Sequence, residues 1–223
     1  MTTKKLRLKD VIKVNQAIIL DLDQTLVHTL DNKDEWKKFK ETAIKTNDQD
    51  LLNRLYEIKV DDQLICGVMR DHIHEFISYI YSRFSIIGIY SAGSCSYVHA
   101  ITSLLFNDRE LDFIYARDKC VSTIHPTEGE ILSKPLQSLW NKIPGMNQKN
   151  TWMVDDRHDV TIYNQLNHVH VVDYQYNNKQ DTCLLELISF FNRPEITYTT
   201  DIQSILHSKN NLFNIPRCSI FID

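Results

Sequence analysis

The chain has few of the features that mark several common classes of protein. Its five cysteines are scattered over 223 residues without a Cys-x-x-Cys pair, which argues against a disulfide framework and a zinc site. No apolar stretch approaches the length of a membrane span. The net charge of −4 gives no electrostatic reason to expect nucleic-acid binding. We therefore expect an intracellular protein with reduced thiols and without a membrane or nucleic-acid partner.

The composition is that of an ordinary globular protein. Hydrophobic residues make up 43% and charged residues 24% of the sequence, and the length suits one domain that carries an insertion. The first 14 residues hold five basic side chains and no apolar segment, which is not the pattern of a secretory signal. We expect a basic N-terminal arm over 1–13, one domain over 14–208 and a C-terminal tail over 209–223.

Apolar runs and helical stripes alternate along the predicted domain. Short apolar runs predict strands over 17–20, 84–90, 113–116, 151–154 and 168–172. The helical spacing of apolar residues predicts helices over 71–82, 97–106, 134–140 and 182–191. Strands that alternate with helices indicate an α/β fold with a doubly wound, Rossmann-like central parallel sheet.

A polar stretch over about 31–65 interrupts this alternation after the first strand. It has weak helical character over 36–44 and 48–56. An insertion at the carboxyl end of the first strand suits a small flap that faces a substrate. A solvated decoration without a functional contact is the alternative.

The first predicted strand runs directly into a pair of carboxylates. Asp21 and Asp23 follow the apolar residues 17–20 at a spacing of two, and Thr25 lies two residues further on. This spacing places both carboxylates on one side of the chain, at the edge of an α/β sheet where ligands bind. They repel each other unless a cation lies between them. The pattern indicates a Mg²⁺-assisted phosphoryl-transfer site with an aspartate nucleophile, and a surface turn is the alternative.

Other predicted strand ends carry further groups that suit a phosphate. Ser91 follows the second strand and precedes a helix, where a hydroxyl and free backbone N–H groups form an anion site. Lys134 opens a predicted helix and supplies a compact positive charge. Asp155 and Asp156 follow the strand over 151–154. Each alone has a simpler interpretation, as a helix N-cap, a surface lysine and a loop, but their order along the chain favours one site.

These segments resemble the haloacid-dehalogenase-like (HAD-like) superfamily and, within it, the phosphatases of the RNA polymerase II C-terminal domain. The stretch Asp-Leu-Asp-Gln-Thr-Leu-Val-His-Thr over 21–29 is similar to that family's Asp-Leu-Asp-Glu-Thr-Leu-Val-His-Ser. Further similar segments are Arg-Asp-His at 70–72, Tyr-Ser-Ala-Gly at 90–93, Arg-Asp-Lys-Cys at 117–120, Lys-Pro-Leu at 134–136 and Val-Asp-Asp-Arg-His-Asp-Val at 154–160. The resemblance runs from about residue 14 to about residue 192 and implies a HAD-like fold.

The resemblance also implies a role for each of these residues. Asp21 is the expected nucleophile, which forms an aspartyl-phosphate, and Asp23 is the expected general acid and base. The groups expected around the substrate are Thr25, which braces the loop, Ser91 and Lys134, which bind phosphate oxygens, and Arg117, which lies near the phosphate or the peptide.

A magnesium site is implied in the same way. Asp21, the backbone carbonyl of Asp23 and Asp156 are the expected ligands of Mg²⁺, and Asp155 is expected to position Lys134 and metal-bound water. Asp156 stands where some members of the family have asparagine, and both side chains offer an oxygen ligand.

We therefore expect a Mg²⁺-dependent phosphatase that hydrolyses phosphoserine or phosphothreonine in proteins. The partner is then a phosphorylated protein or peptide, with the repeats of the RNA polymerase II C-terminal domain among the candidates. The resemblance implies that the intracellular location is nuclear or cytoplasmic. The insertion is small, and an open site suits a phosphopeptide better than a buried metabolite. The alternatives are a phosphatase of small phosphomonoesters or polynucleotide ends, and a catalytically silent scaffold. All the motif acids are retained, which disfavours the scaffold.

Overall fold

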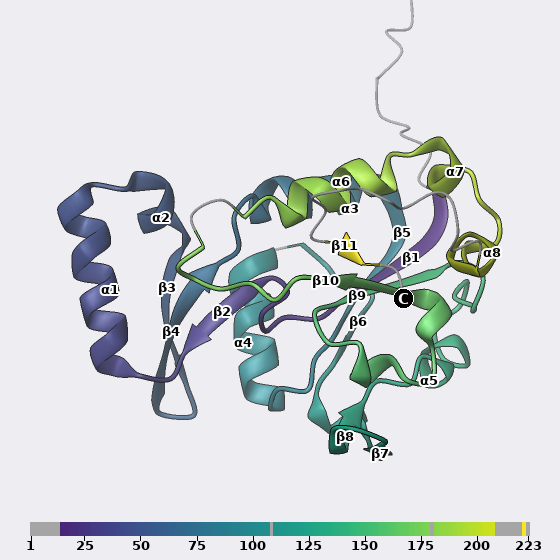
Figure 1. Ribbon diagram of the computed structural model, residues 1–223, viewed down its shortest axis with the longest axis horizontal. Coiled ribbons are helices and arrows are strands. Elements are labelled where there is room, and N and C mark those ends of the chain that lie inside the picture. The colour runs from purple at the N-terminus through teal and green to yellow at the C-terminus, as the bar shows by residue number, and fades with distance from the viewer. Residues whose placement is uncertain (1–13, 108, 179–180, 208–219, 222–223) are drawn as a thin grey trace, which may run out of the picture.

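A six-stranded sheet forms the centre of the fold (Figure 1). The computed structural model describes residues 14–107, 109–178, 181–207 and 220–221. The predicted basic arm over 1–13 lies outside the described residues, as does the predicted tail apart from residues 220–221. All of the predicted site residues lie within the described part of the chain.

Five strands of the central sheet are parallel, in the order β10-β9-β1-β5-β6, and β11 pairs antiparallel with β10 at one edge. Their bounds are Val14–Leu20 (β1), Phe84–Tyr90 (β5), Phe113–Tyr115 (β6), Thr151–Asp155 (β9), His168–Val171 (β10) and Ile220–Phe221 (β11). The five predicted strands and the parallel, doubly wound sheet are thereby confirmed. The central strand is β1, whose apolar residues 17–20 have no exposed surface.

Successive side chains of β1 enter two hydrophobic cores on opposite faces of the sheet, as a period of two requires. Ile18 and Leu20 belong to the larger core, and Ala17 and Ile19 belong to the smaller one. The helices that contribute to the larger core include α3 (Ile73–Arg83), α4 (Cys95–Phe106) and α6 (Cys183–Phe191), followed by α7 (Pro194–Thr197) and α8 (Ile202–His207). The smaller core includes residues of α5 (Gln137–Trp140). No helix in the described ranges is both long and apolar enough to cross a bilayer.

The insertion after β1 contains a small sheet that the sequence analysis did not predict. Its strands are β2 (Val27–Leu30), β3 (Leu55–Val60) and β4 (Gln63–Met69), in the antiparallel order β2-β4-β3. The predicted helical segments correspond to α1 (Lys33–Thr46) and α2 (Gln49–Arg54), so the expectation of a helix to residue 56 is wrong for its last two positions. Figure 1 shows the insertion at one side of the central sheet.

The strand signal in the insertion is present in the sequence but short. Tyr56, Ile58 and Val60 alternate with polar residues, which is the pattern of a half-buried strand. Asp61 and Asp62 join β3 to β4 with φ angles of 48° and 65°. Two successive positive φ angles are typical of a two-residue hairpin turn, and aspartate tolerates them better than most residues.

A second hairpin precedes Lys134. It consists of β7 (Val121–His125) and β8 (Gly129–Ser133), where no regular structure was predicted. The expectation that Lys134 opens a helix is wrong, because Lys134 directly follows β8 and α5 begins only at Gln137. Pro135 gives the reason, since the residue before a proline is disfavoured in the helical conformation. Three short 3₁₀ turns complete the fold, at Arg117–Lys119, Asp159–Thr161 and Gln165–Asn167.

Candidate active site

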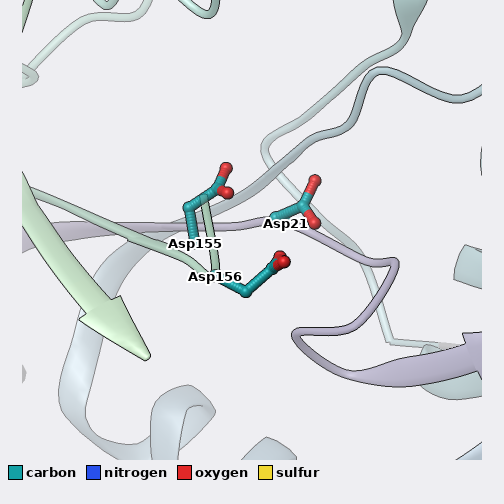
Figure 2. Close-up of side chains that lie close together, drawn as sticks. All are labelled: Asp21, Asp155 and Asp156. Atoms are coloured by element: carbon teal, nitrogen blue, oxygen red, sulfur yellow. The ribbon is translucent and has the colours of Figure 1, made fainter. Parts of the chain in front are cut away.

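The predicted site residues gather at the carboxyl edge of the central sheet. Asp21 follows β1, Asp155 is the last residue of β9 and Asp156 comes next, while Ser91 follows β5. Because β9, β1 and β5 are adjacent and parallel, these residues leave the sheet side by side. Figure 2 shows the carboxyl groups of Asp21, Asp155 and Asp156 close together.

A tight turn carries the first motif away from β1. The Asp21 N–H donates to the Val154 carbonyl at 3.0 Å, which ties the motif to β9. The Leu22 carbonyl then accepts from the N–H groups of Leu26 at 2.8 Å and Val27 at 3.0 Å. Between them Gln24 has a φ of 61°, a left-handed conformation that reverses the chain within a few residues. Leu22 and Leu26 are fully buried, so hydrophobic packing anchors both sides of this turn.

Lys134 lies between two buried carboxylates. Its Nζ donates to Asp21 Oδ1 at 2.5 Å and to Asp155 Oδ2 at 2.6 Å, and the lysine is only 3% exposed. Its own N–H donates to the Val160 carbonyl at 2.8 Å, which fixes the backbone from which the side chain extends. Burial by itself lowers the pKa of Lys134, but Asp155 and Asp21 reverse this and raise the pKa above its ordinary value. The lysine is therefore an ammonium ion at neutral pH.

The carboxylates of Asp21, Asp155 and Asp156 form a group that fits a hard cation. One oxygen from each lies within 4.8 Å of the others. Burial raises the pKa of Asp21 well above its ordinary value, although Lys134 opposes the rise, and it raises the pKa of Asp156 to about 6, with Asp155 adding to the effect. Three crowded carboxylates and one ammonium leave an excess of negative charge, and oxygen ligands of this kind are those that Mg²⁺ prefers. The predicted ligation by the Asp23 backbone carbonyl stays a prediction.

Asp155 and Asp156 accept hydrogen bonds that hold them in place. Thr25 Oγ1 donates to Asp156 Oδ1 at 3.0 Å and accepts from the Asp156 N–H at 3.1 Å. The Arg157 N–H donates to Asp155 Oδ1 at 2.9 Å. Thr25 has no exposed surface, so its hydroxyl acts inside the loop by linking the turn after β1 to the end of β9.

A buried arginine supports the same turn from the other side. Arg70, which directly follows β4, donates from Nη1 to the carbonyl of Thr25 at 3.1 Å and from Nη2 to that of Val172 at 2.9 Å. It also makes a bidentate ion pair with Asp181, at 2.9 and 2.8 Å. The guanidinium has no exposed surface and fastens the first motif to the segment after β10. The sequence analysis noted Arg70 as part of a motif but assigned it no role.

Asp23 is not one of the three clustered carboxylates. Its Oδ1 accepts a hydrogen bond from the Tyr97 hydroxyl, which comes from α4. Burial raises the pKa of Asp23, and the Tyr97 hydrogen bond opposes that rise. A half-buried carboxyl with a raised pKa is suited to general acid and base chemistry. The sequence analysis missed Tyr97, because no local pattern marks a contact between residues 74 positions apart.

Ser91 and Arg117 complete the set of predicted residues. Ser91 is buried, and its Oγ accepts from the Gly93 N–H at 3.1 Å, while the cap of α4 is Ser94. Ser91 is therefore not the N-cap that the simpler interpretation proposed. Arg117 is exposed, and its Nε donates to the Ala92 carbonyl at 2.8 Å. Within the described residues its guanidinium makes no ion pair with the aspartates of the site.

Comparisons with known proteins identify a family and two similar structures. A family model described as NLI interacting factor-like phosphatase matches residues 16–203. A structure of the fission yeast RNA polymerase II CTD phosphatase Fcp1, an arginine variant bound to beryllium fluoride, is 19% identical with a TM-score of 0.55. That match covers 78% of this chain and 49% of the Fcp1 chain. A second structure, of Fcp1 as an essential RNA polymerase II CTD phosphatase, is 17% identical with a TM-score of 0.54, and covers 90% and 55%.

These matches establish the fold and the family. The chain spans about half the length of the two Fcp1 structures. A search of curated proteins gives no match. The family model extends over most of the chain and includes every predicted site residue. As the resemblance predicted, the chain belongs to the NLI interacting factor-like phosphatase family, with a HAD-like fold.

Proposed function

We propose that this chain is a Mg²⁺-dependent phosphatase that hydrolyses phosphoserine or phosphothreonine in proteins through an aspartyl-phosphate. The observation that supports this most is the ammonium of Lys134, held between Asp21 and Asp155 with Asp156 beside them. Burying these charges is costly, and a folding role alone gives no reason to keep them. A phosphate with its metal ion is a ligand that uses all of them.

Asp21 and Asp23 share the chemistry of the first step. A carboxylate oxygen of Asp21 attacks phosphorus, and the bond between phosphorus and the ester oxygen breaks with its electron pair going to that oxygen. Asp23 donates a proton to the leaving oxygen, which departs as the free serine or threonine hydroxyl. In the second step Asp23 takes a proton from water, which attacks the aspartyl-phosphate and restores the Asp21 carboxylate.

The remaining residues bind and orient the phosphate. Lys134 offers a fixed positive charge, and Ser91 offers a hydroxyl at the neighbouring strand end. Asp21, Asp156 and the backbone carbonyl of Asp23 would hold Mg²⁺, which would supply positive charge that offsets the charge on the transferred phosphoryl group. Thr25 and Arg70 keep the turn after β1 in place, so the nucleophile needs no rearrangement before attack.

A phosphorylated protein segment is the substrate class that fits best. The insertion is small, its β3 strand packs against α4, and it lies at one side of the central sheet (Figure 1). Among the described residues no large domain covers the site, and such a site admits an extended peptide. The two structural neighbours are phosphatases of the RNA polymerase II C-terminal domain, so its phosphorylated repeats are the first peptides to test. Such a substrate is consistent with an intracellular protein.

The first test is hydrolysis of p-nitrophenyl phosphate and of a phosphoserine peptide by the purified chain, with Mg²⁺ or with EDTA. Asp21→Asn is nearly isosteric and removes the nucleophile, and Asp34→Asn is a matched control at an exposed position in α1. We expect activity that requires Mg²⁺, disappears in Asp21→Asn and is unchanged in Asp34→Asn. Equal activity of Asp21→Asn and the unmodified chain would contradict an aspartate nucleophile. Faster hydrolysis of free sugar phosphates than of phosphopeptides would contradict the substrate class.

A further inference from the structure

The insertion sheet, formed by β2, β4 and β3, has one row of paired residues with a glycine at its centre. Thr29 on β2 pairs with Gly67 on β4, and Gly67 pairs with Tyr56 on β3, so the three residues lie in one row across the sheet. A Cβ atom on Gly67 would lie 2.3 Å from the Tyr56 hydroxyl oxygen. The Tyr56 ring therefore crosses β4 through the space that glycine leaves open, which is a recurrent use of glycine within a strand.

The ring of Tyr56 reaches across this row to a chain of hydroxyl groups. Its hydroxyl lies 2.8 Å from Thr29 Oγ1, and Thr29 Oγ1 lies 2.7 Å from the Tyr97 hydroxyl. Tyr97 in turn donates to Asp23 Oδ1. Each hydroxyl has a single hydrogen to donate. Because Tyr97 uses its hydrogen on Asp23, Thr29 donates to Tyr97 and Tyr56 donates to Thr29, so all three hydrogen bonds point towards Asp23.

This arrangement distinguishes the two oxygens of the Asp23 carboxyl group. Oδ1 accepts the hydrogen of Tyr97, and in the described part of the chain this is the only hydrogen bond that the carboxyl group makes. We propose that Tyr97, held by Thr29 and Tyr56, is a positioning residue that fixes the Asp23 carboxyl and reserves its Oδ2 for proton transfer to the leaving group. This inference rests on the proposed phosphatase activity and gives the insertion sheet a part in it.

The physical basis is that a carboxyl group free to rotate offers its proton in the required direction only part of the time. General acid catalysis typically contributes about 10²- to 10⁴-fold to a rate. Loss of orientation removes a part of that contribution, and we expect about tenfold. The loss depends on the leaving group, because a serine alkoxide needs a proton as it departs, whereas nitrophenolate is a weak base that leaves without one.

The test compares kcat/KM for a phosphoserine peptide and for p-nitrophenyl phosphate in Tyr97→Phe. The value of kcat/KM reports the steps up to formation of the aspartyl-phosphate, where the acid acts on the leaving group. We expect kcat/KM for the peptide to fall about tenfold and kcat/KM for the aryl ester to fall much less. Thr29→Val keeps the size of the side chain and removes the bridging hydroxyl. It should also lower kcat/KM for the peptide more than kcat/KM for the aryl ester, by a smaller factor than Tyr97→Phe.

The control is Tyr79→Phe. It removes a hydroxyl on α3 that donates to Oδ1 of Asn192, the residue after α6, outside the hydroxyl chain. In Tyr79→Phe, kcat/KM for the peptide relative to kcat/KM for the aryl ester should match that of the unmodified chain. Circular dichroism checks the fold of each variant. An equal fall for both substrates, or no fall for the peptide, in both Tyr97→Phe and Thr29→Val would overturn the inference. If Asp21→Asn remains active, the proposed function itself has failed, which is a distinct outcome.

Discussion

The buried carboxyl group of Asp156 makes the folding stability of the chain depend on pH. Its pKa is raised from an ordinary value of 3.8 to about 6, chiefly because the carboxyl is buried and then because Asp155 is near. At about 1.4 kcal/mol for each tenfold change in proton affinity, the raised pKa corresponds to about 3 kcal/mol. The folded chain binds a proton there that the unfolded chain releases, so stability falls as the pH rises from about 4 to about 6 and does not return above that range.

The perturbation that isolates this effect is Asp156→Asn. Asparagine is neutral at every pH, and its Oδ1 still accepts the hydrogen bond that Thr25 Oγ1 donates at 3.0 Å. Without metal at pH 7.5, we expect the variant to be more stable than the unmodified chain by up to about 3 kcal/mol. Near pH 4 the difference in stability between the two chains should almost vanish, because Asp156 is then protonated in the folded state and is neutral like asparagine.

The assay is urea unfolding in EDTA at both pH values, with Asp34→Asn as the matched exposed control. Added Mg²⁺ should stabilise the unmodified chain at pH 7.5 more than it stabilises Asp156→Asn, because the cation offsets the charge that the variant lacks. Equal stability of Asp156→Asn and the unmodified chain in EDTA at pH 7.5 would refute the reasoning, since Asp156 would then carry no penalty of charge burial.

Three further substitutions test the supports of the site. Lys134→Met leaves two buried carboxylates unpaired, so we expect a loss of about 3–5 kcal/mol in urea unfolding at pH 7.5; an unchanged midpoint would contradict the buried ion pairs. Arg70→Met leaves Asp181 unpaired and should cost a similar amount, visible as a lower Tm; a fall no greater than that of an exposed arginine variant would argue against this. Gly88→Ala would place a Cβ 2.1 Å from Phe113 Cζ, and we expect a loss of about 1–3 kcal/mol that Phe113→Leu partly restores.

The fold was predictable where the signal was local and strong. Each buried parallel strand is an apolar run that needs no partner to be recognised, and the residues that follow it lie at the sheet edge by construction. Asp21, Ser91 and Asp155 could therefore be assigned to one edge from the sequence. The order of motifs assigned Lys134 to the site, and its ammonium does lie between Asp21 and Asp155. The helix predicted to begin at Lys134 was wrong, because the proline after it outweighed the helical pattern.

The insertion shows where prediction from the sequence failed. The signal for β3 covers only six residues and follows directly on a helical segment. The strand is stabilised by pairing with β4, which also pairs with β2 on its other side. A strand that depends on partners elsewhere in the chain has a weak local signature. The small sheet was thus missed, and with it the row that brings Tyr56 to Thr29.

The sequence by itself indicated the chemistry that we propose for the site, because residue type and order place carboxylates, a hydroxyl and a lysine directly after strands. Only the tertiary structure decided how these groups are oriented. The Lys134 ammonium reaches Asp21 across 113 positions of the chain, and Tyr97 reaches Asp23 across 74. Such contacts depend on where α4 and β8 lie in the folded chain, and no local pattern encodes them. The proposed nucleophile, Asp21, is therefore visible in the sequence, while the residues that we propose to orient Asp23 are found only in the folded chain.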